Sequence, residues 1–126
     1  MTETATIVLP LPPAILSPNC PSGSRGGRFA RAAASKKYRK LARDAAASLD
    51  LSSTWRKCTV KAFFFHKTAR RRDDVNHLAM LKPAYDGCVE AGLVLDDDSE
   101  HLASLPAVFA IDREFPRVEL VFTRVL

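Results

Sequence analysis

Residues 70–98 read RRRDDVNHLAMLKPAYDGCVEAGLVLDDD. Three arginines run directly into two aspartates, a stretch with helical spacing of apolar residues follows, and three consecutive aspartates end the segment. Carboxylate oxygens are the ligands that Mg²⁺ prefers, while arginine and lysine bind phosphate. The segment therefore indicates a metal ion held against a phosphate backbone, as in a metal-dependent nuclease.

One helix is expected inside this segment, over about residues 77–91. Asn76 suits the N-cap, and Gly92 suits the position just past the C-terminus. Pro83 falls within the helix and should kink it at a cost of roughly 3 kcal/mol. The residues that recur at helical spacing, and so form the expected buried stripe, are Leu78, Leu81, Tyr85, Cys88 and Val89.

The two groups of aspartates lie at opposite ends of this helix and meet only if the following loop folds back. Phosphodiester hydrolysis needs an activated water and a stabilised leaving oxyanion, and one or two Mg²⁺ ions supply both. Lys82 and Asp86 share a helix face at i,i+4 spacing, which also fits a simple exposed ion pair. Neither His77 nor His101 has a partner at metal-ligand spacing, so both are expected to be structural, with His77 at most an outer-sphere helper.

The flanking sequence predicts a small α+β domain. Residues 14–28, rich in Pro, Ser and Gly, are expected to form a mobile loop. The expected elements are a strand at 4–9, a helix at 30–49, a strand at 56–66, the helix at 77–91, and a hairpin of strands at 105–111 and 117–125. The order β-α-β-α-β-β gives one mixed sheet packed with two helices, in a single domain spanning residues 1–126.

Charge is divided unevenly along the chain, although the net charge is only +5. Residues 1–72 carry 15 Lys or Arg and 3 Asp or Glu, whereas residues 73–126 carry 4 and 11. This asymmetry predicts a basic surface for a polyanion beside an acidic cluster. The alternative is two solvated faces that only neutralise each other.

The expected helix at 30–49 is strongly basic. No acidic residue occurs between Glu3 and Asp44, so its cations lack the i,i+4 partners of an ordinary solvated helix. We therefore expect contact with nucleic acid rather than a role in solubility alone. The expected DNA-binding residues, here and in the arginine run, are Arg25, Arg28, Arg31, Lys36, Lys37, Lys40, Arg70, Arg71 and Arg72.

The remaining features favour a cytoplasmic protein without a membrane partner. Cys20, Cys58 and Cys88 share no spacing typical of a disulfide framework or zinc site, so free and mostly buried thiols are expected. A secretory signal is not expected, because no basic region precedes an apolar run at the N-terminus. A membrane span is not expected either, because no apolar run reaches the roughly 18 residues that it requires. It also lacks the GxSxG, GxGxxG and Walker-type glycine motifs.

Several of these motifs resemble the RusA family of Holliday junction resolvases, small homodimeric endonucleases of bacteria and phages. TIVLPLPP at 6–13 is similar to the family's opening strand and proline turn, and KKYRKLARDAA at 36–46 is similar to its first helix. The run from RRRD through LKPAYDGCVEAGLVLDDD resembles the family's RD…K…D…AG…DD core. The resemblance implies paired symmetric nicking of four-way DNA junctions, dependent on Mg²⁺ or Mn²⁺, in the cytoplasm of a bacterial or phage-infected cell.

The resemblance also implies roles for single residues. Asp73 and Asp97 correspond to catalytic metal ligands, and Lys82 corresponds to the catalytic lysine that stabilises phosphate charge. Arg72 corresponds to the arginine beside the site. The residues expected to support the site are Asn76, Asp86 and Asp96.

Two departures from the family pattern concern the acids and the lysine. The usual Asp, any residue, Asp, Asn reads here Asp73, Asp74, Val75, Asn76, so Asp74 is expected as the replacement metal ligand. Lys82 lies about one helical turn further from the acids than in the family pattern. Two alternatives therefore stay open: a non-catalytic module that binds structured DNA, and a nuclease of the same chemistry that acts on flaps or forks.

Overall fold

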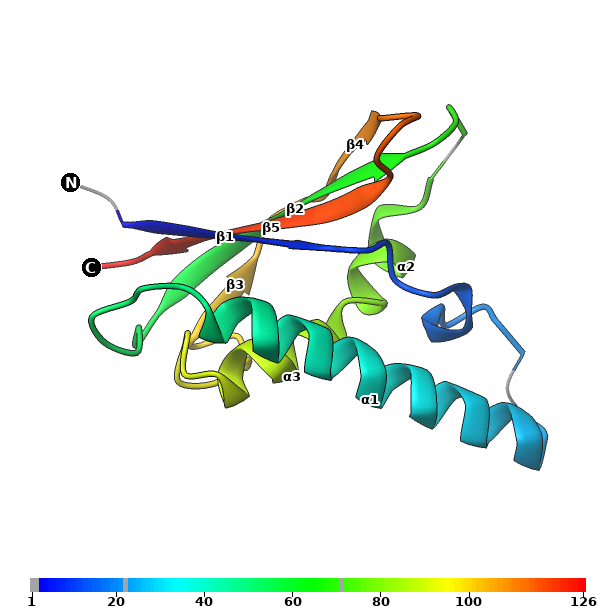
Figure 1. Cartoon of the computed structure of the whole chain (residues 1–126), viewed down its shortest axis with the longest axis horizontal. Coiled ribbons are helices and arrows are strands. Elements are labelled where there is room, and N and C mark those ends of the chain that lie inside the picture. Colours follow the sequence, from blue (N-terminus) through cyan, green and yellow to red (C-terminus); the bar gives the residue numbers. More distant parts are fainter. Residues whose placement is uncertain (1–2, 22, 71) are drawn as a thin grey trace.

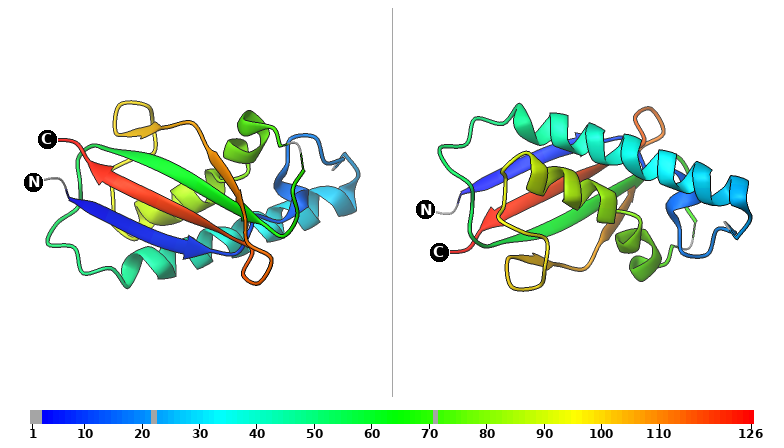
Figure 2. Two further views of the ribbon diagram at one scale, coloured as in Figure 1. Left: turned by 90° about the horizontal axis from the view of Figure 1, so that it is seen from above. Right: turned by 90° about the horizontal axis from the view of Figure 1, so that it is seen from below.

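The computed structural model describes residues 3–21, 23–70 and 72–126. The strands are β1 (Thr4–Leu9), β2 (Cys58–His66), β3 (Leu102–Ser104), β4 (Val108–Ile111) and β5 (Arg117–Arg124). The helices are η1 (Ala14–Leu16, a 3-10 helix), α1 (Arg25–Ala47), α2 (Asp74–Ala79) and α3 (Lys82–Glu90). The strands form one mixed sheet, and α1 and α3 cover one of its faces (Figures 1 and 2). The predicted α+β class is confirmed.

Strand β2 lies at the centre of the sheet. On one side β5 pairs with it antiparallel, and β1 pairs with β5 at that edge. On the other side β3 and β4 pair with β2 in parallel, β3 along 58–60 and β4 along 63–66. Pro106 lies between these two short strands, where proline cannot donate a hydrogen bond to a sheet ladder.

The predicted hairpin of strands 105–111 and 117–125 is wrong. Strand β4 pairs with β2 rather than with β5, so the connection at 112–116 passes from one edge of β2 to the other. Strand β3 was not predicted. A central strand has backbone groups to satisfy on both edges, and β2 therefore takes partners on both sides. Alternating apolar residues predict a strand, but they do not identify its neighbour.

Helix α1 begins five residues before its predicted start at 30 and ends two residues before its predicted end at 49. The hydroxyl of Ser24 accepts a hydrogen bond from the backbone N–H of Gly27 at 3.0 Å, which caps the first turn. The predicted loop at 14–28 is therefore wrong at its end, and it also contains η1. Gly26 and Gly27 lie in the first turn of α1, next to the Ser24 cap, so their low helix propensity does not delay the start of the helix.

The single helix predicted at 77–91 is two helices. Helix α2 begins after the N-cap Asp73 rather than after Asn76, and α3 starts at Lys82. Pro83 lies in the first turn of α3, where its missing N–H leaves no intrahelical bond unmade, so the chain breaks instead of kinking. Gly92 follows α3 with a φ of 86°, as its predicted place past the helix end requires.

The core lies between the sheet and helices α1 and α3. Alternate residues of β1, β2 and β5 are buried, and they meet Tyr38 and Ala42 of α1 and Cys88 of α3. The cysteines are free, and Cys58 and Cys88 are buried, as predicted. Within the described residues, no helix combines the length and apolar character that a membrane crossing requires.

Candidate functional site

Lys82 lies at the start of α3 between two carboxylates. Its Nζ donates to Oδ1 of Asp86 at 2.8 Å and also to Oδ2 of Asp97. Asp86 follows one turn later on α3, whereas Asp97 comes from the loop beyond that helix. The loop folds back because Leu93 and Val94 are buried. The loop after α3 therefore brings Asp97 back to Lys82 at the start of the helix.

Hydrogen bonds within this cluster favour the charged forms of both Lys82 and Asp97. The bond from Lys82 holds the pKa of Asp97 below its ordinary value of 3.8, so this carboxylate is ionised at neutral pH. The bonds to Asp86 and Asp97 in turn raise the pKa of Lys82. Asp96 adjoins the cluster, since its Oδ1 accepts from the backbone N–H of Asp97 at 2.7 Å.

A hollow of about 370 Å³ joins this cluster to the basic helix. Lys36 and Arg39 of α1 line it together with Lys82 and Asp86 of α3. Arg39 was not among the predicted DNA-binding residues, although it follows Lys36 by three positions and so shares its helix face. Arg39 also lies 3.6 Å from Glu90 of α3, measured from Nε to Oε2. Lys37 and Lys40 are exposed elsewhere on α1.

Asp73 and Asp74, near the start of the segment 70–98, each accept a hydrogen bond from a backbone N–H group. The Oδ1 atom of Asp73 caps α2 by accepting from the N–H of Asn76 at 3.2 Å. The Oδ1 atom of Asp74 accepts from the N–H of Ala107, at 2.8 Å, between β3 and β4. Val75, in the position of the missing acid, is 73% exposed.

Within the described residues, Asp73, Asp74 and Asp97 do not gather at metal-binding distance. The group that does comprises Asp98, Glu100 and His101, whose ligand atoms lie within 4.8 Å of one another. The ring Nδ1 of His101 lies 2.7 Å from Oδ1 of Asp98, and this bond lowers the pKa of Asp98. The structure thus pairs His101 with a carboxylate three residues before it, a spacing that the sequence interpretation passed over.

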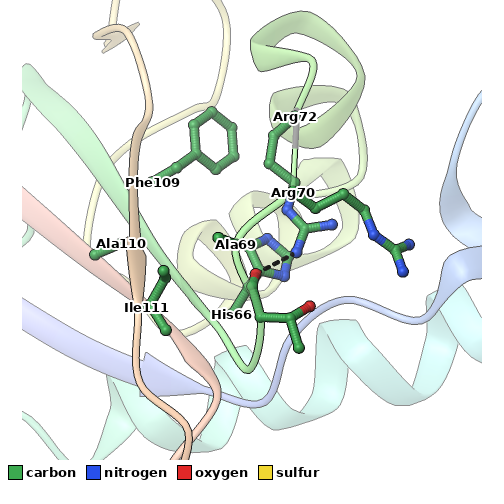
Figure 3. A pocket seen from close by; sticks show the side chains of 8 residues that line it. His66, Ala69, Arg70, Arg72, Phe109, Ala110 and Ile111 are labelled. Atoms are coloured by element: carbon green, nitrogen blue, oxygen red, sulfur yellow. Dashed lines mark hydrogen bonds between the residues drawn. The ribbon is translucent and has the colours of Figure 1, made fainter.

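The arginine run borders a second hollow, of about 190 Å³, at the end of β2 (Figure 3). Arg72 extends beside the ring of His66 and donates to the carbonyl oxygen of Thr68 at 3.1 Å, whereas Arg70 points away (Figure 3). Burial lowers the pKa of His66 to about 4, and the charge of Arg72 acts in the same direction. The ring is therefore neutral at pH 7, and it stacks on Phe109. Arg71 lies outside the described residues.

The remaining predicted DNA-binding residues lie at the start of α1. Arg28 donates to the carbonyl oxygen of Gly23 at 2.8 Å. Arg31 donates to the carbonyl oxygens of Ser17 and Cys20 at 2.9 and 3.0 Å, and so ties the preceding loop to the helix. Arg25 is exposed.

Comparisons of the chain with models of known protein families and with curated proteins find no match. The resemblance to RusA resolvases therefore stays a prediction that rests on the sequence motifs. The site residues inferred from it stay predictions as well.

Proposed function

We propose that this chain is a Mg²⁺-dependent endodeoxyribonuclease that resolves four-way DNA junctions, in DNA recombination and repair, as a homodimer. The observation that carries the proposal is the hollow that Lys36 and Arg39 line together with Lys82 and Asp86. Lys82 also bonds to Asp97. Lys82 thus lies beside cations that would bind a phosphate backbone and beside carboxylates that would bind a metal ion. Two copies related by a two-fold axis suit paired cuts in a two-fold-symmetric junction.

The carboxylates around Lys82 are oxygen donors of the kind that bind a hard divalent cation. Asp97 is ionised, Asp86 and Asp96 adjoin it, and Mg²⁺ takes oxygen ligands while keeping several waters. Asp86, Asp96 and Asp97 would hold the ion. Asp73 and Asp74 stay predicted ligands, but they do not adjoin this group. When bound, Mg²⁺ acidifies a water and stabilises the leaving oxyanion.

The protein's own cations position and stabilise the phosphate. Lys36 and Arg39 project from one face of α1 into the hollow and would bind the backbone of a DNA strand. Lys82 keeps its positive charge to high pH because its pKa is raised, so it is available to neutralise charge on the phosphate. Arg72, beside His66, would contact the strand at the other end of α2.

A cleavage assay on a synthetic four-way junction tests the proposal. We expect Mg²⁺-dependent paired nicks from the wild type, and a loss of about 100-fold or more in rate for Asp97→Asn and Asp73→Asn, as for loss of other charge-stabilising groups. Glu114→Gln, which changes an exposed acid elsewhere, is the matched control. Equal cutting by all four proteins would overturn the site. Rates on flaps and forks, measured in parallel, define the substrate class.

A second candidate function is a non-catalytic module that binds structured DNA. The observation that favours it is the engagement of Asp73 and Asp74 with backbone amides, together with an exposed Val75 where an acid is expected. Tight junction binding without cleavage at any Mg²⁺ or Mn²⁺ concentration would establish this function in place of the first.

A further inference from the structure

The first turns of α1 carry an exposed aromatic side chain. The start of α1 extends beyond the end of the sheet (Figures 1 and 2). Phe29, in its second turn, is 64% exposed. An aromatic ring left in water forgoes the stabilisation that burial would give it. Phe29 therefore contributes little to the fold and is available for contact with a partner.

Two arginines share a hollow with this ring. Arg25 precedes Phe29 by one turn, and its Cζ lies 5.8 Å from the ring centroid. Arg25, Arg28, Phe29 and Ala32 together line a shallow hollow of about 360 Å³. The guanidinium of Arg28 is held in place by its bond to the Gly23 carbonyl. The hollow thus combines an open aromatic face with two guanidinium groups.

The positive charge of α1 favours one kind of occupant. The sequence from residue 4 to residue 43 has eight lysines and arginines and no acidic residue. A purely apolar partner would leave the charges of Arg25 and Arg28 unneutralised, whereas a polyanion neutralises them. Bases of single-stranded nucleic acid stack on exposed aromatic side chains, and arginine adds a cation–π contribution. Bases inside a duplex present only their edges and cannot stack on Phe29.

We propose that Phe29 is a stacking platform for an unstacked nucleobase of DNA, with Arg25 and Arg28 binding the adjoining phosphates. The proposal rests on the DNA binding in the proposed function, and it is independent of cleavage. In a branched DNA, the base pairs at the point of strand exchange can lose a stacked neighbour and expose a base face. The platform would therefore make the protein prefer branched or single-stranded DNA over a continuous duplex.

Binding measured by fluorescence anisotropy in EDTA tests this inference, because no cleavage occurs without a divalent ion. The probes are a fluorescein-labelled 20-mer single strand, a four-way junction, and a duplex of the same sequence. We expect Phe29→Ala to weaken binding to the first two by about 5- to 100-fold, the usual effect of losing one stacked base. Duplex affinity should change by less than about twofold, and Phe29→Trp should bind like the wild type, because it keeps a ring for stacking.

Two further variants make the test specific. Leu41→Ala removes an exposed apolar side chain from the same helix and should change none of the affinities. Phe29→Leu keeps apolar bulk without a π-face and should resemble Phe29→Ala. Wild-type affinity in Phe29→Leu, an equal loss on all three probes, or no loss in Phe29→Ala would each overturn the platform. Phe29-dependent binding in a protein that never cleaves would refute the nuclease and leave the platform supported.

Discussion

Lys82 joins a helix, an acidic loop and a basic hollow through a single ammonium group. It bonds to Asp86 one turn away and to Asp97 from the following loop, and it lines the same hollow as Lys36. The sequence interpretation singled out Lys82 and left open whether its pairing with Asp86 is only a surface ion pair. The additional bond to Asp97 ties the acidic loop at 96–98 to the start of α3.

The stability of the protein should depend on this link at low pH. Because the pKa of Asp97 is lowered by folding, its contribution is present above the unfolded value of about 3.8 and is lost as the pH falls through the folded value. Lys82→Met should raise the pKa of Asp97 and so reduce the loss of stability on acidification below about pH 5. Urea unfolding at several pH values, with carboxyl NMR titration of Asp97, measures both effects.

The raised pKa of Lys82 acts at the other end of the pH range. Its contribution to stability is complete below the unfolded value of 10.5 and is lost as the pH rises through the higher folded value. The contribution is small, because the side chain of Lys82 is 62% exposed and solvent screens its charge. Identical acid profiles for the wild type and Lys82→Met would show that the bond between Lys82 and Asp97 does not form in solution.

Asp74 shows how a residue predicted from a motif acquires a second task. The resemblance made it the replacement for an acid at Val75, whereas the structure places one of its oxygens on the N–H of Ala107. That amide lies 33 positions away, where the edge of the sheet is interrupted beside Pro106. Its role as a metal ligand stays a prediction. The bond to Ala107 does not contradict that prediction, because it uses only one of the two carboxylate oxygens.

At the scale of elements, the crossing of α1 and α3 determines where the candidate site lies. A Cβ added to Gly87 would overlap the carbonyl oxygen of Arg39 and would lie 2.9 Å from the backbone nitrogen of Arg43. The two helices are therefore in backbone contact at this point. The close approach places the start of α3, with Lys82, beside Lys36 and Arg39.

Gly87→Ala should therefore destabilise the protein by about 1–3 kcal/mol, because the added methyl group forces the helices apart. Gly26→Ala is the matched control, since a Cβ there meets nothing within 4 Å. The control should gain up to about 1 kcal/mol from the better helix propensity of alanine. Urea denaturation measures both, and equal effects of the two substitutions would contradict the close crossing.

Over the whole molecule, the uneven charge predicts salt-dependent binding to DNA. Log affinity falls linearly with log salt concentration, and each lysine or arginine that neutralises a duplex phosphate makes this slope steeper by about 0.9. Lys36→Ala and Arg39→Ala should each reduce the slope by about that amount. Arg124→Ala, which removes a cation paired with Glu3 at 2.8 Å, should leave it unchanged. Equal slopes for all four proteins would place the DNA elsewhere.

The sequence by itself determined the α+β class and most strands and helices, because these depend on residues within a few positions of one another. The strands at 4–9 and 117–124 and the buried stripe of α3 follow from such local alternation. Motifs and charge also singled out Lys82, Asp97 and the basic helix. The kink predicted at Pro83 within one helix was wrong, because proline in the first turn of a helix marks its start rather than bending its middle.

Only the tertiary structure decided which of these parts meet. The pairing of β4 with β2, the return of Asp97 to Lys82, and the hollow shared by Lys36 and Lys82 all join residues far apart in the chain. Such contacts depend on packing around the common core, which the local sequence does not encode one segment at a time. Residues 70–98 therefore contain the predicted catalytic residues, and the packing of α3 against α1 places Lys36 and Arg39 beside Lys82.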